Sequence, residues 1–246
     1  MENGKETIEK IEQLVKKSLI VEVDGRKYSA LDLNPVFYEP RPAPVKLHDL
    51  KGFCQFIKAD IDDKIKGKQH LVVVSSHDFV FLTSNITGET QNRTVLVSAK
   101  IRDELQTFPF GRFMPQEEFV IKFRSLFVPN TNDDSDYVLQ YTSKLVGGTE
   151  IDSSDDGITQ GVTVKRKING ALTEKTNLKP IVRLTPWRTF RDVEQPTSEF
   201  LFRVRMNNDI PEVALFEADG GVWIEKAIEN IVKFIENRIE NIPVIA

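Results

Sequence analysis

The sequence predicts an α+β fold with a largely antiparallel sheet, flanking helices and a long C-terminal amphipathic helix. Hydrophobic residues make up 40% of the 246 residues, and Phe alone accounts for 16 positions, so there is ample apolar material for a core. Helical patterns and short β-rich runs do not alternate regularly along the chain, which disfavours a parallel doubly wound sheet. The length suits one domain, and we expect a single α+β domain over residues 1–246.

The N-terminal part of the chain predicts a helix, a hairpin and a connector. Apolar residues recur at helical spacing in 7–19, namely Ile8, Ile11, Leu14, Val15 and Leu19. The dipeptide Asp24-Gly25 favours a tight turn between two short strand-like runs. Four prolines follow, at positions 35, 40, 42 and 44, and proline opposes regular structure. We therefore expect a helix-hairpin arm over 1–34 and a proline-rich connector over 35–47.

The next part of the chain predicts three helices and an antiparallel meander. A clean apolar stripe predicts a helix over 48–66, and Gly67 supplies its end. Three β-rich runs predict the meander: 71–75, 79–83 and 93–100. Pro115 opens a second helix and Pro129 ends it. One face of that helix is aromatic and should be buried; it carries Phe119, Val120, Phe123, Leu126 and Phe127. A shorter helix is expected over 135–145.

The C-terminal part predicts strands and a final helix. The acidic, glycine-containing stretch 149–161 indicates an exposed loop. Asn169-Gly170 between two β-rich runs is the strongest hairpin signal in the sequence. Three further strands are expected: 181–184, 200–206 and 213–216. Residues 221–241 predict a long helix whose apolar arc is wide enough to be buried on more than one side or in a subunit interface, so we expect a homo-oligomer.

Few residues suggest catalysis or metal binding. The single cysteine, Cys54, excludes an intramolecular disulfide, and its place on the apolar stripe of 48–66 indicates a buried hydrophobe. The three histidines do not have the spacing of a metal site: they are His48, His70 and His77. The stretch that begins at Asp152 matches the opening of a calcium loop, but its twelfth position is Thr163 instead of Glu. We therefore expect no catalytic residue, no metal and no cofactor.

Charge and hydropathy favour a cytoplasmic protein that does not enter a membrane. No apolar run approaches the roughly 20 residues that cross a bilayer, and the charged N-terminus lacks an apolar signal core. The formal net charge is −4, yet residues 159–205 carry ten basic side chains against four acidic ones. Such segregation is typical of an anion-binding face on an acidic body, although ion pairs with that body would also account for it.

The candidate ligand-binding site lies in this basic segment and at the start of the last helix. Guanidinium groups pair with phosphate oxygens and an aromatic plane stacks a base, so this composition suits a nucleotide or a nucleic-acid strand. Asp219 is the expected N-cap of the last helix, and the glycines after it leave backbone N–H groups open to an anion. The predicted ligand-binding residues are Arg183, Trp187, Arg188, Arg191, Arg203, Arg205, Asp219, Gly220 and Gly221. The prediction depends on the five arginines meeting around Trp187.

Two C-terminal motifs carry a resemblance to a known family. They are PWRTFRDVEQPTSEF over 186–200 and LFEADGGVW over 215–223. Both are similar to the C-terminal signature of the YfdQ-like proteins, which phages and prophages encode and which have no established activity. The resemblance implies a phage accessory protein acting in the cytoplasm of a bacterial host.

Three hypotheses for the function follow. The first is a non-enzymatic protein that sequesters a small anionic, nucleotide-like ligand, plausibly a signal of host anti-phage defence. The second is an accessory protein of phage replication or recombination that binds single-stranded nucleic acid through the same residues. The third is a structural or assembly protein, which the wide apolar arc of the last helix suggests. The acidic charge outside one basic segment favours a local pocket over an extended groove, so ligand capture is the preferred hypothesis.

Overall fold

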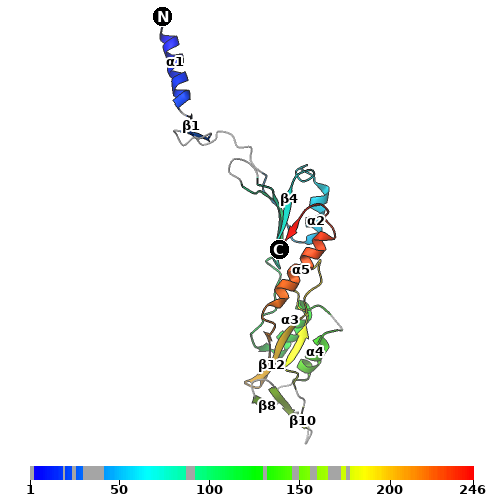
Figure 1. Ribbon diagram of the computed structural model, residues 1–246. Helices are drawn as coiled ribbons and strands as arrows, with labels where there is room; N and C mark the ends of the chain where they lie inside the picture. The colour runs from blue at the N-terminus through cyan, green and yellow to red at the C-terminus, as the bar shows by residue number, and fades with distance from the viewer. Residues whose placement is uncertain are drawn as a thin grey trace. The chain divides into compact units, whose positions relative to one another are not determined.

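The computed structural model describes residues 3–18, 20–23, 26–29, 42–86, 92–129, 132–145, 150–155, 160–165, 173–175 and 178–246 (Figure 1). The chain is α+β, as predicted, with helices and mostly antiparallel sheets. It divides into two compact units, Met1–Ala43 and Pro44–Ala246. The division falls inside the predicted proline-rich connector. The predicted turns Asp24-Gly25 and Asn169-Gly170 lie outside the described residues.

The first unit contains the predicted helix and hairpin. Helix α1 spans Asn3–Ser18, and strands β1 (Ile20–Val23) and β2 (Arg26–Ser29) pair in antiparallel register. The apolar face of α1 is exposed, with Ile8 61% and Leu14 63% accessible to solvent. This helix is therefore amphipathic by sequence without burying its apolar side chains in a core.

A five-stranded sheet forms one part of the second unit. The predicted meander is present as β4 (His70–Ser76), β5 (Phe79–Ser84) and β6 (Val95–Lys100). Two short edge strands that the sequence did not reveal pair in parallel with it: β3 (Val45–Leu47) on β6 and β14 (Val244–Ile245) on β4. Alternate strand residues are buried, such as Val72, Val80 and Val97, and they form a core with helices α2 (Leu50–Ala59) and α5 (Val222–Glu236).

Helix α2 is shorter than predicted, spanning Leu50–Ala59 instead of 48–66. Asp60 ends it in the left-handed conformation, with φ of 45°. The Asp60 carboxylate then accepts hydrogen bonds from the backbone N–H groups of the next turn, at Lys64, Ile65 and Lys66. Ile61, predicted on the buried stripe, is consequently 78% exposed, whereas Ile65 is buried outside the helix.

A four-stranded antiparallel sheet forms the other part of this unit. Its order is β11 (Ile181–Leu184), β12 (Ser198–Asn207), β13 (Ile210–Glu217) and β7 (Met114–Pro115). Helices α3 (Gln116–Leu126) and α4 (Ser135–Lys144) pack on it. The predicted aromatic face of α3 is buried, and Phe123 stacks on Phe127 with ring centroids 4.2 Å apart.

Asp134 covers the outer edge of this sheet. Its backbone N–H donates to the carbonyl of Arg183 at 2.9 Å, and its carboxylate accepts the backbone N–H of Arg183 at 2.8 Å. One residue thus satisfies both backbone groups of Arg183 on the edge strand β11. Lys179 Nζ adds a 2.7 Å bond to the same carboxylate.

The acidic stretch predicted to be a loop contains a strand. Residues Glu150–Asp155 form β8, which pairs with β9 (Gln160–Lys165), and β9 pairs with β10 (Thr173–Lys175). The pairing of β9 with β10 confirms the predicted hairpin strands. Polar composition misled the prediction for 149–161 because a backbone ladder requires little of the side chains.

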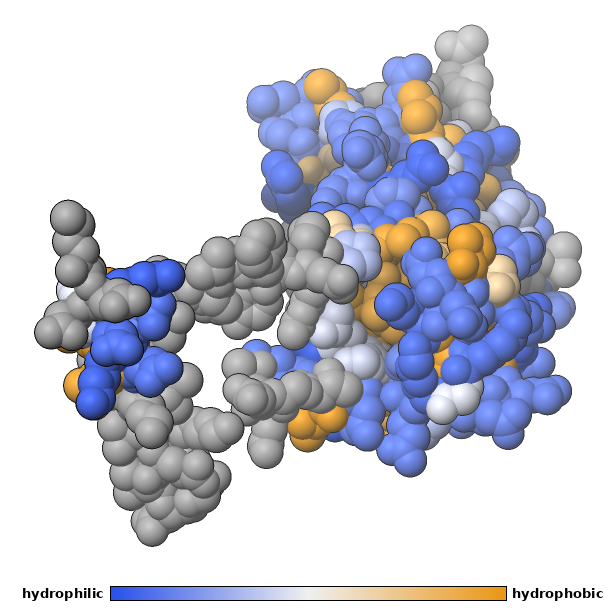
Figure 2. Space-filling model, turned by 90° about the horizontal axis from the view of Figure 1, so that it is seen from above, coloured by the Kyte–Doolittle hydropathy of each residue, from blue (hydrophilic) through white to orange (hydrophobic). Residues whose placement is uncertain are grey.

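Helix α5 (Val222–Glu236) connects the two parts of the second unit and is shorter than the predicted 221–241. Ala227, Ile231 and Ile235 are fully buried, and the two isoleucines belong to the core of the five-stranded sheet. Side chains that widen the apolar arc, such as Phe234, also pack against that core. Most of the arc therefore finds contacts within its own unit, but Val222 and Ile224 at the start of the helix are 63% and 38% exposed. Hydrophilic residues predominate on the face seen in Figure 2.

Candidate functional site

The connection between β11 and β12, residues 185–197, links the two cores of the second unit. Pro186 bridges to Phe127 beside the four-stranded sheet, whereas Phe190 is buried in the core of the five-stranded sheet. Thr189 Oγ1 donates to the carbonyl of His77 at 2.6 Å. The predicted Arg-Trp segment is therefore anchored at both ends.

Gln195 holds this connection in shape from inside. Its Oε1 accepts the backbone N–H groups of Arg188 and Thr189 at 3.0 and 3.1 Å. Its Nε2 donates to the carbonyls of Phe190 and Val193 at 2.9 and 3.2 Å. A buried amide with this many partners fixes the backbone, so the side chains projecting from it start from defined positions.

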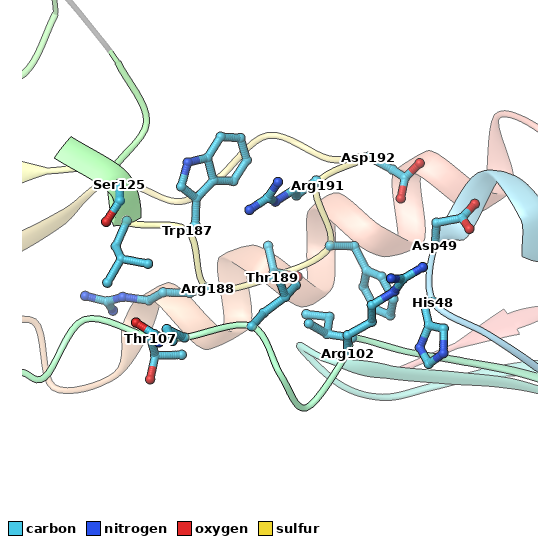
Figure 3. Close-up of a pocket in the computed structure, with 15 residues that line it drawn as sticks. His48, Asp49, Arg102, Thr107, Ser125, Trp187, Arg188, Thr189, Arg191 and Asp192 are labelled. Carbon is cyan, nitrogen blue, oxygen red and sulfur yellow. The ribbon is translucent and has the colours of Figure 1, made fainter. Parts of the chain in front are cut away.

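A cavity of about 380 Å³ opens beside this connection (Figure 3). Its walls come from the start of α2, the segment after β6, the end of α3 and the connection itself. The lining residues are His48, Asp49, Ile101, Arg102, Leu105, Gln106, Thr107, Ser125, Leu126, Trp187, Arg188, Thr189, Phe190, Arg191 and Asp192. Three predicted site residues, Trp187, Arg188 and Arg191, are among them.

Arg191 and Arg102 are the two exposed cations of this cavity. The guanidinium carbon of Arg191 lies 5.3 Å from the ring centroid of Trp187, and the Trp187 backbone N–H donates to Leu126. Among the described residues, neither arginine forms an ion pair with a carboxylate. Stacking on an indole holds a guanidinium without neutralising it, so Arg191 is presented to the cavity with its charge available.

Two carboxylates line the cavity at the N-terminus of α2. Asp49 is the N-cap and accepts the backbone N–H of Gly52 through Oδ1 at 2.6 Å. Asp192 reaches the same helix from the connection and accepts the backbone N–H of Leu50 through Oδ2 at 3.0 Å. The positive end of the helix stabilises both negative charges.

His48 has a defined tautomer in its neutral form. Nδ1 lies 2.9 Å from the carbonyl oxygen of Lys100, and a carbonyl can only accept. The proton is therefore on Nδ1, and Nε2 is an acceptor.

Arg188 is buried instead of facing a ligand. Its side chain is 6% exposed, and its guanidinium carbon lies 4.7, 5.0 and 4.6 Å from the ring centroids of Phe110, Phe200 and Trp223. Nη1 lies 3.0 Å from a carboxylate oxygen of Glu217, which is the distance of an ion pair. This contact does not meet the geometry of a hydrogen bond, and no other guanidinium nitrogen has a hydrogen-bond partner in the described part of the chain. Burial lowers the pKa of Arg188, and the charges of Glu217 and Asp219 oppose this effect. We call Arg188 together with the rings of Phe110, Phe200 and Trp223 the arginine cage.

The five predicted arginines do not meet around Trp187, which corrects the sequence prediction. Arg183 lies on β11 and is exposed, while Arg203 lies on β12 with Nη1 near the carbonyl of Phe202. Arg205 pairs with Glu212 at 2.6 Å and lies over the Phe113 ring. None of these three lines the cavity. They belong to strands, whereas the connection that carries Trp187 runs away from them to the other core.

The start of α5 also differs from the prediction. Gly221, with φ of 87°, is the N-cap, and Asp219 stands two residues before it. The Asp219 carboxylate accepts the Gly221 N–H at 3.1 Å, so a carboxylate of the chain already bonds to this N–H. Gly220 has φ of 62°, a conformation that glycine adopts without strain. Asp219, Gly220 and Gly221 do not line the cavity.

Sequence reasoning missed the residues that complete the cavity, above all Arg102, Asp49 and Asp192. Arg102 follows a predicted strand, but nothing in its local pattern connects it with a segment almost ninety positions later. In the part of the chain that the structure describes, no cluster of His, Cys, Asp or Glu could hold a metal ion. No helix among those same residues has both the length and the apolar character to span a membrane.

Comparison with known proteins yields no relative: no protein-family model, no curated protein and no solved structure matches the chain.

Proposed function

We propose that the protein is a non-enzymatic binding protein that captures a small anionic, nucleotide-like ligand in the cavity beside Trp187. The observation that carries this proposal is the Arg191 guanidinium, which stacks on Trp187 and has no carboxylate partner among the described residues. A guanidinium fixed in this way pairs with phosphate oxygens at a small cost in conformational entropy. The cavity volume of about 380 Å³ is within the range of small-molecule sites.

Two of the three hydroxyl groups that line the cavity, those of Ser125 and Thr189, favour binding over catalysis. Ser125 Oγ donates to the carbonyl of Lys122 at 3.0 Å, and Thr189 Oγ1 donates to the carbonyl of His77. A nucleophilic hydroxyl needs its proton directed at a general base, and these protons are directed at backbone carbonyls instead. Ser125 and Thr189 therefore supply shape and polarity without acting as activated nucleophiles.

The biological setting we propose comes from the resemblance to YfdQ-like phage proteins. A phage accessory protein that captures a nucleotide in the bacterial cytoplasm would counter a host defence that signals through nucleotides. The motif over 186–200 that carries this resemblance includes Trp187, Arg191 and Asp192 of the cavity.

Isothermal titration of the full chain with a panel of nucleotides tests the proposal. We expect heat of binding from at least one nucleotide, and R191A should weaken it by roughly 10- to 100-fold because a charge-assisted contact is lost. R183A is the matched control, since Arg183 is exposed but lies outside the cavity. Equal losses in both variants, or no heat from any nucleotide, would overturn the proposal.

The salt dependence separates capture of a small ligand from binding of single-stranded nucleic acid. Binding along a nucleic-acid backbone weakens steeply as salt rises, because many counterions are released. Contact with one or two arginines in a cavity should produce a shallow dependence. A steep dependence with oligonucleotides, unaffected by R191A, would favour the nucleic-acid alternative.

A further inference from the structure

The cavity presents opposite charges at its two ends. In Figure 3, Arg191 points toward Trp187 at one end, while the carboxylates of Asp49 and Asp192 lie together at the other. The Arg102 side chain extends toward the carboxylate end. A ligand that is only an anion, such as inorganic phosphate, would pair with the arginines but would offer no hydrogen-bond donor to the two carboxylates.

Helix capping accounts for only one oxygen of each carboxylate. Asp49 uses Oδ1 for Gly52, and Asp192 uses Oδ2 for Leu50. The second oxygen of each has no hydrogen-bond donor among the described residues. Both side chains are accessible to solvent, and an ionised carboxylate can only accept, so these oxygens are available to N–H groups of a ligand.

The carboxylate end therefore suits a ligand group that has N–H donors for Asp49 and Asp192 and, next to them, an acceptor for Arg102. Guanine has this pattern on two neighbouring edges: its ring N–H and exocyclic amine donate to a carboxylate on one edge, and its O6 and N7 accept from an arginine on the next. Adenine offers an amine but no carbonyl on that edge, and inosine lacks the amine.

We infer that the ligand is a guanine mononucleotide, with its base facing Asp49, Asp192 and Arg102 and its phosphate paired with Arg191. This inference rests on the proposed function of the cavity. The cavity volume of about 380 Å³ lies at the small end of the range of ligand sites, which suits a single nucleotide better than an oligonucleotide. The separation of the phosphate from both carboxylates follows from the direction of the Arg191 side chain.

Titration of the full chain with GMP, IMP, AMP and ribose 5-phosphate tests the inference. GMP and IMP differ only in the exocyclic amine, so we expect GMP to bind roughly 10- to 100-fold more tightly. Ribose 5-phosphate should bind weakly, through the phosphate alone. This comparison uses the unaltered protein and does not depend on any variant folding.

The substitution Asp192→Asn tests whether Asp192 recognises the exocyclic amine of guanine. The amide oxygen of Asn still accepts the Leu50 N–H, while its NH₂ group presents a donor where guanine also donates. The preference for GMP over IMP should disappear in D192N and persist in D62N, an exposed control outside the cavity. Circular dichroism checks that each variant keeps the helix content of the wild type, and D49N provides a second variant if D192N does not fold.

Different results would overturn the guanine inference and the proposed function. Equal affinity for GMP, IMP and AMP would overturn the guanine inference and leave the proposed function standing. A preference for GMP that survives in D192N and D49N would also overturn it, because other groups would then recognise the amine. No binding by any of these compounds, with no heat from other nucleotides, would remove the proposed function itself.

Discussion

The arginine cage makes a quantitative prediction about stability. R188M removes the guanidinium and keeps most of the aliphatic stem, while W223L removes one of the three rings around it. The Arg188 side chain is 6% exposed, and Trp223 is the nearest ring, at 4.6 Å from the guanidinium carbon. A cation over an aromatic face contributes about 2 kcal/mol when desolvated, so we expect a coupling free energy of about 2 kcal/mol between the two residues.

Urea unfolding of the wild type, both single variants and the double variant measures this coupling as a double-mutant cycle. The exposed pair of Arg205 and Phe113, with Arg205 52% exposed and 4.1 Å from the ring centroid, serves as the control. Its coupling should be only about 0.5 to 1 kcal/mol, because water screens the charge. If the costs of R188M and W223L add to within about 0.5 kcal/mol, the cage contributes no specific interaction and the reasoning is wrong.

Three further predictions concern the core and two ionisable groups. Backbone hydrogen bonds, led by that of Lys66, hold the pKa of Asp60 below its ordinary value, against the opposing effect of burial. Since the pKa of Asp60 is lower in the folded state, its contribution to stability is complete above the unfolded-state pKa of about 3.9. This contribution is lost as the pH falls through the folded-state pKa. The difference in Tm between the wild type and D60N should therefore become smaller below about pH 4. Burial raises the pKa of Cys54 to about 11, so a chromogenic thiol reagent should react slowly with the folded protein near pH 8 and rapidly after unfolding. F123A should lower the free energy of unfolding by about 3 to 5 kcal/mol in urea titrations, because Phe123 is 2% exposed; a cost below about 1 kcal/mol would contradict the close packing of α3 on the sheet.

Elements with strong periodicity could be predicted from the sequence, and elements that depend on distant partners could not. The aromatic face of α3 and the alternation of apolar and polar residues in β12 are local patterns. The aromatic side chains of α3 and the apolar side chains Phe200, Phe202 and Val204 of β12 are buried as expected. Strand β3 is three residues long, and only its parallel pairing with β6, about fifty positions away, defines it. The end of α2 was missed because Ile61 and Ile65 continue the apolar spacing, whereas Asp60 turns the backbone.

The candidate site was predictable in part for the same reason. Trp187, Arg188 and Arg191 lie close together in sequence, so one connection brings them to one cavity wall. Composition could not show that Arg188 points into an aromatic core while Arg191 faces the cavity, because the directions follow from how Gln195 folds the connection. Arg102 and Asp49 line the cavity only because the segment after β6 and the start of α2 pack against that connection, which a local sequence pattern does not show.

The contact of Asp134 with strand β11 has a consequence for the behaviour of the protein in concentrated solution. A sheet margin with unsatisfied amide and carbonyl groups recruits strands from neighbouring molecules and leads to aggregation. Asp134 occupies both such groups of Arg183, and it does so with a charged side chain that an incoming strand would have to displace. Asp134, which directly precedes α4, therefore opposes the addition of an intermolecular strand at this position of β11.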